Sequence, residues 1–120
     1  MAMKVEVEVD LFSGRPNPVW TLPEAEAAVL LQKLDALPAA PARALSGDLG
    51  YRGLLVRVTG GPRERRLSIQ QGVIRVEEDE TPAFLEDDGR ALERWLLQTG
   101  RPFLSGELFA LIEAQAATGG

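Results

Sequence analysis

The stretch Lys4-Val5-Glu6-Val7-Glu8-Val9-Asp10-Leu11-Phe12 decides the fold, because apolar and charged residues alternate along it. A period of two is the side-chain period of a β-strand, so the apolar residues face one side and the charged residues the other. Since the second side is charged, one face of the sheet meets water. This favours an antiparallel or mixed sheet over a parallel sheet that is covered on both faces. The stretch therefore predicts an α+β domain.

Further strands are expected in the middle of the chain. Residues 51–59 carry apolar side chains on both faces, which predicts a central place in the sheet. After a hairpin tip at Gly60-Gly61, residues 66–70 return as another strand. Residues 73–78 are either a separate strand or a continuation of the preceding one through a glycine bulge. The predicted sheet has three or four strands.

A first helix is expected directly after the N-terminal strand and its loop. Thr21 is followed by Glu24 at the spacing of a capping box, so the helix is predicted to begin at Thr21. Leucines then repeat at helical spacing and form one apolar stripe. Pro38 ends the pattern.

Two more helices are expected near the C-terminus. Asp87 or Asp88 caps the first, which runs to Gly100, and Ser105 caps the second. The second helix fades into residues 116–120, a tail that we expect to be frayed.

Together the elements predict a two-layer α+β domain with the order βαβββαα and about three helices packed with the sheet. The length predicts a single globular domain over residues 1–120. The residues on apolar faces form the predicted core: Val7, Val9, Leu30, Leu34, Val56, Val58, Ile69, Leu92, Trp95 and Leu96.

Composition excludes several classes of function. The 120 residues contain no Cys and no His, which removes thiolate and imidazole catalysis and the metal sites built on these side chains. We therefore expect no cofactor. The 13 Lys and Arg stand against 18 Asp and Glu, and the net charge of −5 argues against a nucleic-acid partner. The charged N-terminal stretch and the lack of a run of about 20 apolar residues predict neither a signal peptide nor a membrane span, so a cytoplasmic location is expected.

Two charged stretches have an ordinary interpretation. Residues 77–88 hold seven carboxylates but lack the ligand spacing of a calcium-binding loop, so a solvated surface is favoured over a metal site. Arg63, Arg65 and Arg66 form a basic hairpin tip, which is too small for a nucleic-acid interface and is typical of a solvated turn.

The loop of residues 13–20 is the strongest candidate for a binding site. Two prolines restrict its backbone on either side of Asn17, so ordering it on a ligand costs little entropy. Arg15 and Asn17 would hydrogen-bond an anion or a peptide backbone, and Trp20 would form a stacking wall. The alternative is a structural connector in which Arg15 is solvated and Trp20 packs against the helix that follows.

The predicted function is a non-catalytic binding or accessory module that recognises a partner protein, a peptide or a small anionic ligand. Its site would be the loop of residues 13–20 together with the neighbouring strand start at Tyr51 and Arg52. Two alternatives stay open: a small cofactor-independent enzyme that uses a carboxylate with Arg15, and a structural subunit that pairs through a sheet edge. No spacing in the sequence identifies catalytic residues.

Overall fold

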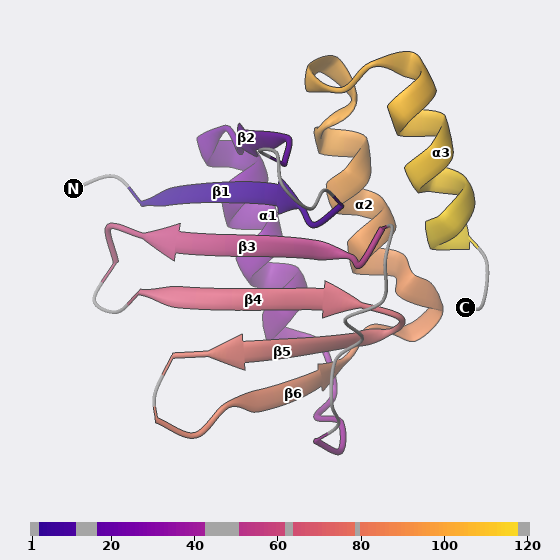
Figure 1. The fold of residues 1–120 in the computed structure, drawn as a ribbon. Coiled ribbons are helices and arrows are strands. Elements are labelled where there is room, and N and C mark those ends of the chain that lie inside the picture. The colour runs from indigo at the N-terminus through magenta and orange to yellow at the C-terminus, as the bar shows by residue number, and fades with distance from the viewer. Residues whose placement is uncertain (1–2, 12–16, 43–50, 62–63, 79, 118–120) are drawn as a thin grey trace.

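The computed structural model describes residues 3–11, 17–42, 51–61, 64–78 and 80–117 (Figure 1). The elements in chain order are β1 (Lys4–Val9), β2 (Val19–Thr21), α1 (Glu24–Asp35), β3 (Leu54–Thr59), β4 (Arg65–Gln70), β5 (Val73–Glu77), β6 (Ala83–Glu86), the 3-10 helix η1 (Asp88–Arg90), α2 (Ala91–Thr99), the 3-10 helix η2 (Arg101–Phe103) and α3 (Gly106–Ala117).

The strands form one open sheet in the order β2-β1-β3-β4-β5-β6, and every neighbouring pair is antiparallel. The predicted α+β class with an antiparallel sheet is confirmed, and β3 lies centrally. The predicted number of three or four strands is wrong, because the described residues already form a sheet of six. The two strands that were not expected, β2 and β6, contain only three and four residues, too few to show a period of two. Residues 73–77 form a separate strand.

The predicted capping box is also wrong. Thr21 lies in β2, where it pairs with Glu6 of β1, and its side chain does not cap a helix. Helix α1 begins after Pro23, at Glu24, and no side chain caps it. Strand pairing with the long N-terminal strand therefore outweighs the local helix signal at Thr21.

Strand β3 begins three residues later than expected, at Leu54. Gly53 has a φ of 108°, which interrupts the ladder, and its carbonyl accepts a hydrogen bond from Asp10 N at 3.0 Å. A Cβ at this position would lie 2.1 Å from the backbone oxygen of Ile69, so only glycine fits between the strands here.

Helices α1 and α2 lie behind the sheet in Figure 1, and α3 packs against α2 on its outer side. The alternating apolar residues of β1, β3 and β4 point to the helices and join one core with residues of α1, α2 and α3. All the predicted core residues are buried except Trp95, which is half-buried and carries Lys33 over its ring at 5.3 Å. We call the opposite side of the sheet the open face, because no helix of the described residues covers it.

Candidate functional site

Asn17 fastens the start of β2 to the end of β1. Its Oδ1 accepts a hydrogen bond from the backbone nitrogen of Leu11 at 3.1 Å, and its Nδ2 donates to Oε2 of Glu8 at 2.8 Å. One amide side chain thus satisfies a backbone donor and fixes the direction of a carboxylate on the open face. Arg15, the neighbouring residue of the predicted site, lies outside the described residues.

Trp20 belongs to the core, where it is 3% exposed. Its indole Nε1 donates to Oγ1 of Thr99 at 2.9 Å, and Thr99 in turn donates to the carbonyl of Leu96. The ring lies against Gly100 at the end of α2, so closely that a Cβ there would stand 2.4 Å from a ring atom. Because the ring is buried, Trp20 does not offer the exposed stacking wall that the sequence suggested.

Tyr51 is turned toward the helices, where it meets a buried ion pair. Its hydroxyl donates to Oε2 of Glu93, which is completely buried on α2. Arg90 holds the same carboxylate with two bonds, from Nε to Oε1 at 3.0 Å and from Nη2 to Oε2 at 2.7 Å. Burial, followed by the charge of Glu93, raises the pKa of Tyr51 far above its ordinary value. The hydrogen bonds to Glu93 raise the pKa of Arg90 as well.

A left-handed turn brings Arg90 into this cluster. Gly89 and Arg90 have φ values of 64° and 56°, and the conformation costs about 1–2 kcal/mol at the non-glycine residue. Asp87, itself buried, caps α2 by accepting hydrogen bonds from Leu92 N at 2.7 Å and Glu93 N at 3.1 Å. The predicted cap at Asp87 is thereby confirmed. A carboxylate and a phenol are groups that can transfer protons, but Glu93 has no exposed surface through which a substrate could touch it.

Arg52 follows Tyr51 just before β3, and its side chain lies on the opposite side from that of Tyr51. Its Nη2 pairs with Oδ1 of Asp10 at 2.9 Å, and its carbonyl accepts a hydrogen bond from Gln70 at 2.8 Å. Asn17 and Arg52 are thus brought together around the end of β1, whereas Trp20 and Tyr51 point away from them into the helical layer. The described residues of the predicted site do not converge on one pocket.

The open face has a hollow of about 320 Å³ that was not predicted as a site. Its lining comes from β1, β3 and β4 together with Val19 of β2 and Glu77 of β5, and the side chains that matter below are Glu8, Leu55, Arg57, Arg66 and Ser68. Two of the predicted loop residues are connected to it, because Val19 lines it and Asn17 holds Glu8. The sequence signal for this surface was the set of charged residues that alternate with the valines of β1, because they face away from the core.

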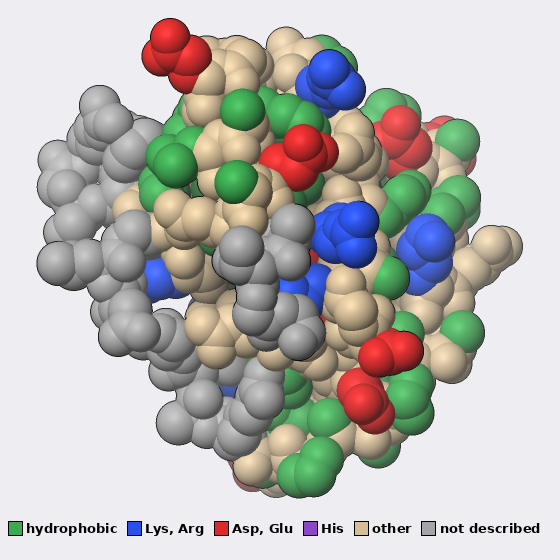
Figure 2. Space-filling model, turned by 90° about the vertical axis from the view of Figure 1, so that its right-hand side faces the viewer, with side chains coloured by type: hydrophobic (Ala, Val, Ile, Leu, Met, Phe, Trp, Pro, Cys, Tyr) green, Lys and Arg blue, Asp and Glu red, His purple; other side chains and the backbone are tan. Residues whose placement is uncertain are grey.

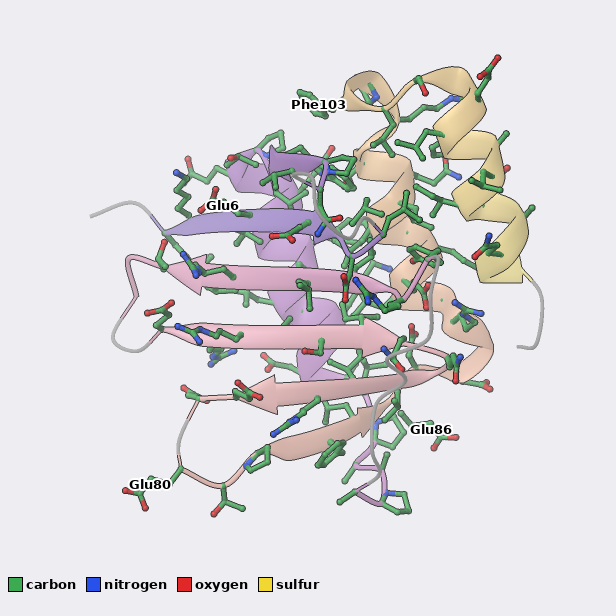
Figure 3. The ribbon with its side chains drawn as sticks, in the orientation of Figure 1. Glu6, Glu80, Glu86 and Phe103 are labelled. Atoms are coloured by element: carbon green, nitrogen blue, oxygen red, sulfur yellow. The ribbon has the colours of Figure 1, made fainter. Side chains whose placement is uncertain are left out.

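Helices α2 and α3 form the side of the molecule that Figure 2 views. Figure 2 shows hydrophobic side chains interspersed with charged ones on this side. Phe103 is 62% exposed and stands away from the body at the turn before α3 (Figure 3), and Leu111 is half exposed on α3. These are single exposed residues of the kind that most proteins carry.

Within the described part of the chain, no group of three or more acidic residues is placed to hold a metal ion. None of the helices described is both long and apolar enough to cross a membrane. Comparisons with protein-family models, with curated proteins and with solved structures find no match for this chain.

Proposed function

We propose that this protein is a non-catalytic binding module whose ligand lies in the hollow of the open face. The observation that carries the proposal is the hollow itself, because at about 320 Å³ it has the size of a small-ligand pocket. Its lining combines the apolar side chain of Leu55, which is 36% exposed, with charged and hydroxyl groups that can orient a ligand.

The rigid sheet supports this role. Apart from Val19 and Glu77, the lining side chains stand on strands β1, β3 and β4, each of which is paired on both sides. The backbone that carries these groups is already ordered, so it loses little entropy when a ligand binds. The loop of residues 13–20 takes part through Val19 and through the hydrogen bond of Asn17 to Glu8, and the proposal extends the role expected for this loop.

The size of the hollow favours a small molecule over a folded partner protein, whose interface would bury about 800 Å² on each side. A peptide that places one side chain in the hollow is the nearest other occupant. The net charge of −5 disfavours nucleic acid. A cytoplasmic location is part of the same proposal.

The other two functions have less support. The buried carboxylate with the best-placed partners, Glu93, is sealed from solvent, and Arg15 lies outside the described residues, so no observation favours an enzyme. At the sheet edges, β6 is partly covered by residues 38–40, where Ala40 N donates to Phe84 O and Glu86 N to Pro38 O. The other edge strand, β2, offers only three residues for pairing.

The test is a titration with small-molecule fragments, in which two-dimensional NMR of the backbone amides detects binding. Small carboxylates, phosphates, amines and uncharged ring compounds are added one at a time to the whole chain. We expect the responding amides to lie around Leu55 and Ser68. The proposal fails if no fragment shifts these amides, or if the shifts cluster on the helical side.

A pair of variants makes the titration specific. Ser68→Phe fills the hollow with a ring on a strand where aromatic residues are well tolerated, and it should abolish the shifts. Thr59→Phe adds the same ring at the end of β3, outside the hollow, and should leave binding unchanged. Loss of binding in both variants would contradict a site at the hollow.

A further inference from the structure

A row of four charges crosses the open face. The register of the strands places Glu6 opposite Arg57, Arg57 opposite Arg66, and Arg66 opposite Glu77. Side chains directly opposite one another on antiparallel strands have Cβ atoms about 4.5–5.5 Å apart. The row therefore has two positive charges in the middle and a negative charge at each end. Glu6 is labelled at one end of it in Figure 3.

The central pair is unfavourable for the fold, because like charges directly opposite each other on a sheet repel. Both side chains are exposed, at 56% for Arg57 and 62% for Arg66. A single carboxylate, that of Glu64, lies near both: its Oε1 is 3.5 Å from Nε of Arg57 and 3.7 Å from Nε of Arg66. Both distances are longer than those of N–H···O hydrogen bonds.

The other acids that line the hollow have nearer partners of their own among the described residues. Glu6 lies 3.9 Å from Lys4, Glu77 lies 3.2 Å from Arg75, and Glu8 accepts a hydrogen bond from Asn17. Among the described residues, two guanidinium groups thus share one weakly held carboxylate. The two arginines at the centre of the hollow are left with N–H donors that make no short hydrogen bond within the described part of the chain.

We infer that Arg57 and Arg66 bind a single oxyanion group, a carboxylate or a phosphate, of the small ligand, and that Glu64 occupies this position until the ligand displaces it. The inference rests on the proposed binding function and assigns its chemistry. The guanidinium groups of Arg57 and Arg66, on neighbouring strands, can give an oxyanion the short charge-assisted hydrogen bonds that they do not make to Glu64. The hollow remains at the surface, so the exchange needs no movement of the backbone.

The ends of the row restrict the ligand further. Glu6 and Glu77 flank the pair on both sides, and they repel a polyanion that would extend along the row. A ligand with one anionic group, and with a neutral or cationic remainder beside the acids, matches this pattern. Leu55 and Ser68 provide an apolar and a hydroxyl contact next to it.

The experiment titrates inorganic phosphate and acetate, in separate arms, into the whole chain at constant ionic strength. The arginine Nε–Hε signals and the backbone amides report binding. Arg57→Gln and Arg66→Gln should each weaken the binding of the anion about tenfold or more, because each loses a charged hydrogen-bond donor. Glu64→Gln should tighten it about threefold, because an exposed competing ion pair is removed.

Two further variants control for net charge. Arg94→Gln and Glu107→Gln change the charge by the same amounts at exposed positions of α2 and α3, and neither should alter anion binding. The backbone amide spectrum shows whether each variant is folded, and since Arg57 and Arg66 are both exposed, at least one of the two variants is expected to remain folded. If phosphate binds more tightly than acetate, the ligand carries a phosphate; if acetate binds more tightly, it carries a carboxylate.

The inference is wrong if phosphate and acetate bind the two arginine variants as they bind the wild type, or if Glu64→Gln has no effect. The proposed function is judged separately by the uncharged fragments. The uncharged fragments can still shift the amides around Ser68 when anion binding does not depend on Arg57 and Arg66. In that case the hollow binds a ligand of other chemistry. If neither class of probe shifts these amides, both proposals fail.

Discussion

The hydroxyl of Tyr51 donates a hydrogen bond of 2.5 Å to Glu93, a residue 42 positions further along the chain. The bond joins the segment before β3 to helix α2, so it ties the middle of the sheet to the helical layer. Arg90 completes the arrangement by holding both oxygens of the same carboxylate. Each buried charge in the cluster therefore has a partner, which is the condition for a tolerable cost of burial.

Replacing Glu93 by Gln should destabilise the protein more than replacing Tyr51 by Phe. Glu93→Gln removes the carboxylate that holds the buried Arg90 guanidinium with two hydrogen bonds, at a cost of about 3–5 kcal/mol. Tyr51→Phe removes one hydrogen bond to a charged acceptor, at about 1.5–3 kcal/mol. Urea denaturation of both variants measures the difference. A smaller loss for Glu93→Gln than for Tyr51→Phe would mean that the ion pair does not hold the cluster together.

The raised pKa of Tyr51 predicts a loss of stability in alkaline solution. The phenol ionises near pH 10 in the unfolded chain but at a higher pH in the folded protein. The unfolded state therefore releases a proton first, and the free energy of unfolding falls as the pH rises above about 10. The advantage of the wild type over Tyr51→Phe should be full below that pH and shrink above it.

Because Tyr51 is the only tyrosine, ultraviolet absorbance follows its ionisation directly. The folded protein should show no tyrosinate until it unfolds. Ionisation of the native protein near pH 10 would show that the hydroxyl does not meet Glu93 in solution.

The sequence predicted the parts of the fold that follow from local periodicity. The alternation from Lys4 onward indicated β1 and its wet face, and the caps at Asp87 and Ser105 marked the starts of the last two helices. It did not predict the short strands β2 and β6, because such strands are defined by their partners. Thr21 illustrates this point, since its pairing with Glu6 overrides a good helix-start signal.

The contacts of the candidate site were less predictable than the fold. Trp20 reaches Thr99 across 79 residues, and Tyr51 reaches Glu93 across 42, so their burial depends on how the helices dock on the sheet. The cross-strand position of Arg57 and Arg66 likewise depends on the register of β3 and β4. In the sequence, Arg66 belongs to a basic hairpin tip that is typical of a solvated turn, whereas Arg57 belongs to the predicted strand of residues 51–59.

The contact between Trp20 and Gly100 predicts that Gly100→Ala is destabilising, by about 1–3 kcal/mol. The backbone of Gly100 is in the right-handed helical region, so alanine would be favoured there if the indole ring did not occupy the space. Gly106→Ala is the control, because a Cβ at Gly106 meets nothing within 4 Å and should stabilise α3 by about 0.4–1 kcal/mol. Thermal unfolding of the two variants should therefore shift in opposite directions, and equal shifts would place the ring elsewhere.

Gly53 should be the least replaceable glycine among those described. Alanine there must adopt a φ near 108° and also overlap the backbone oxygen of Ile69, which cannot move without breaking the β3–β4 ladder. We expect a loss of more than about 3 kcal/mol. Gly89→Ala separates the two causes: it has a φ of 64° with nothing within 4 Å, and should cost only about 1–2 kcal/mol. Similar losses in chemical denaturation would show that φ alone decides.

The two hydrogen bonds of Asn17 can be separated by Asn17→Asp. The aspartate still accepts from Leu11 N, but it cannot donate to Glu8 and places a second carboxylate against it. We expect a loss of about 1–2 kcal/mol at neutral pH, since a charged hydrogen bond in a partly exposed place is replaced by repulsion. Two adjacent carboxylates raise the pKa of one of them in the folded state, so the loss of stability relative to wild type should shrink as the pH falls to about 4.

Asn17→Ala is the control, because it loses the bonds to Leu11 and Glu8 without adding a charge, and its loss of stability should not shrink at acid pH. Denaturation curves of the three proteins at neutral and acid pH provide the comparison. If Asn17→Asp shows the same deficit at both values, Glu8 is not held beside Asn17, and the connection of this loop to the hollow is lost.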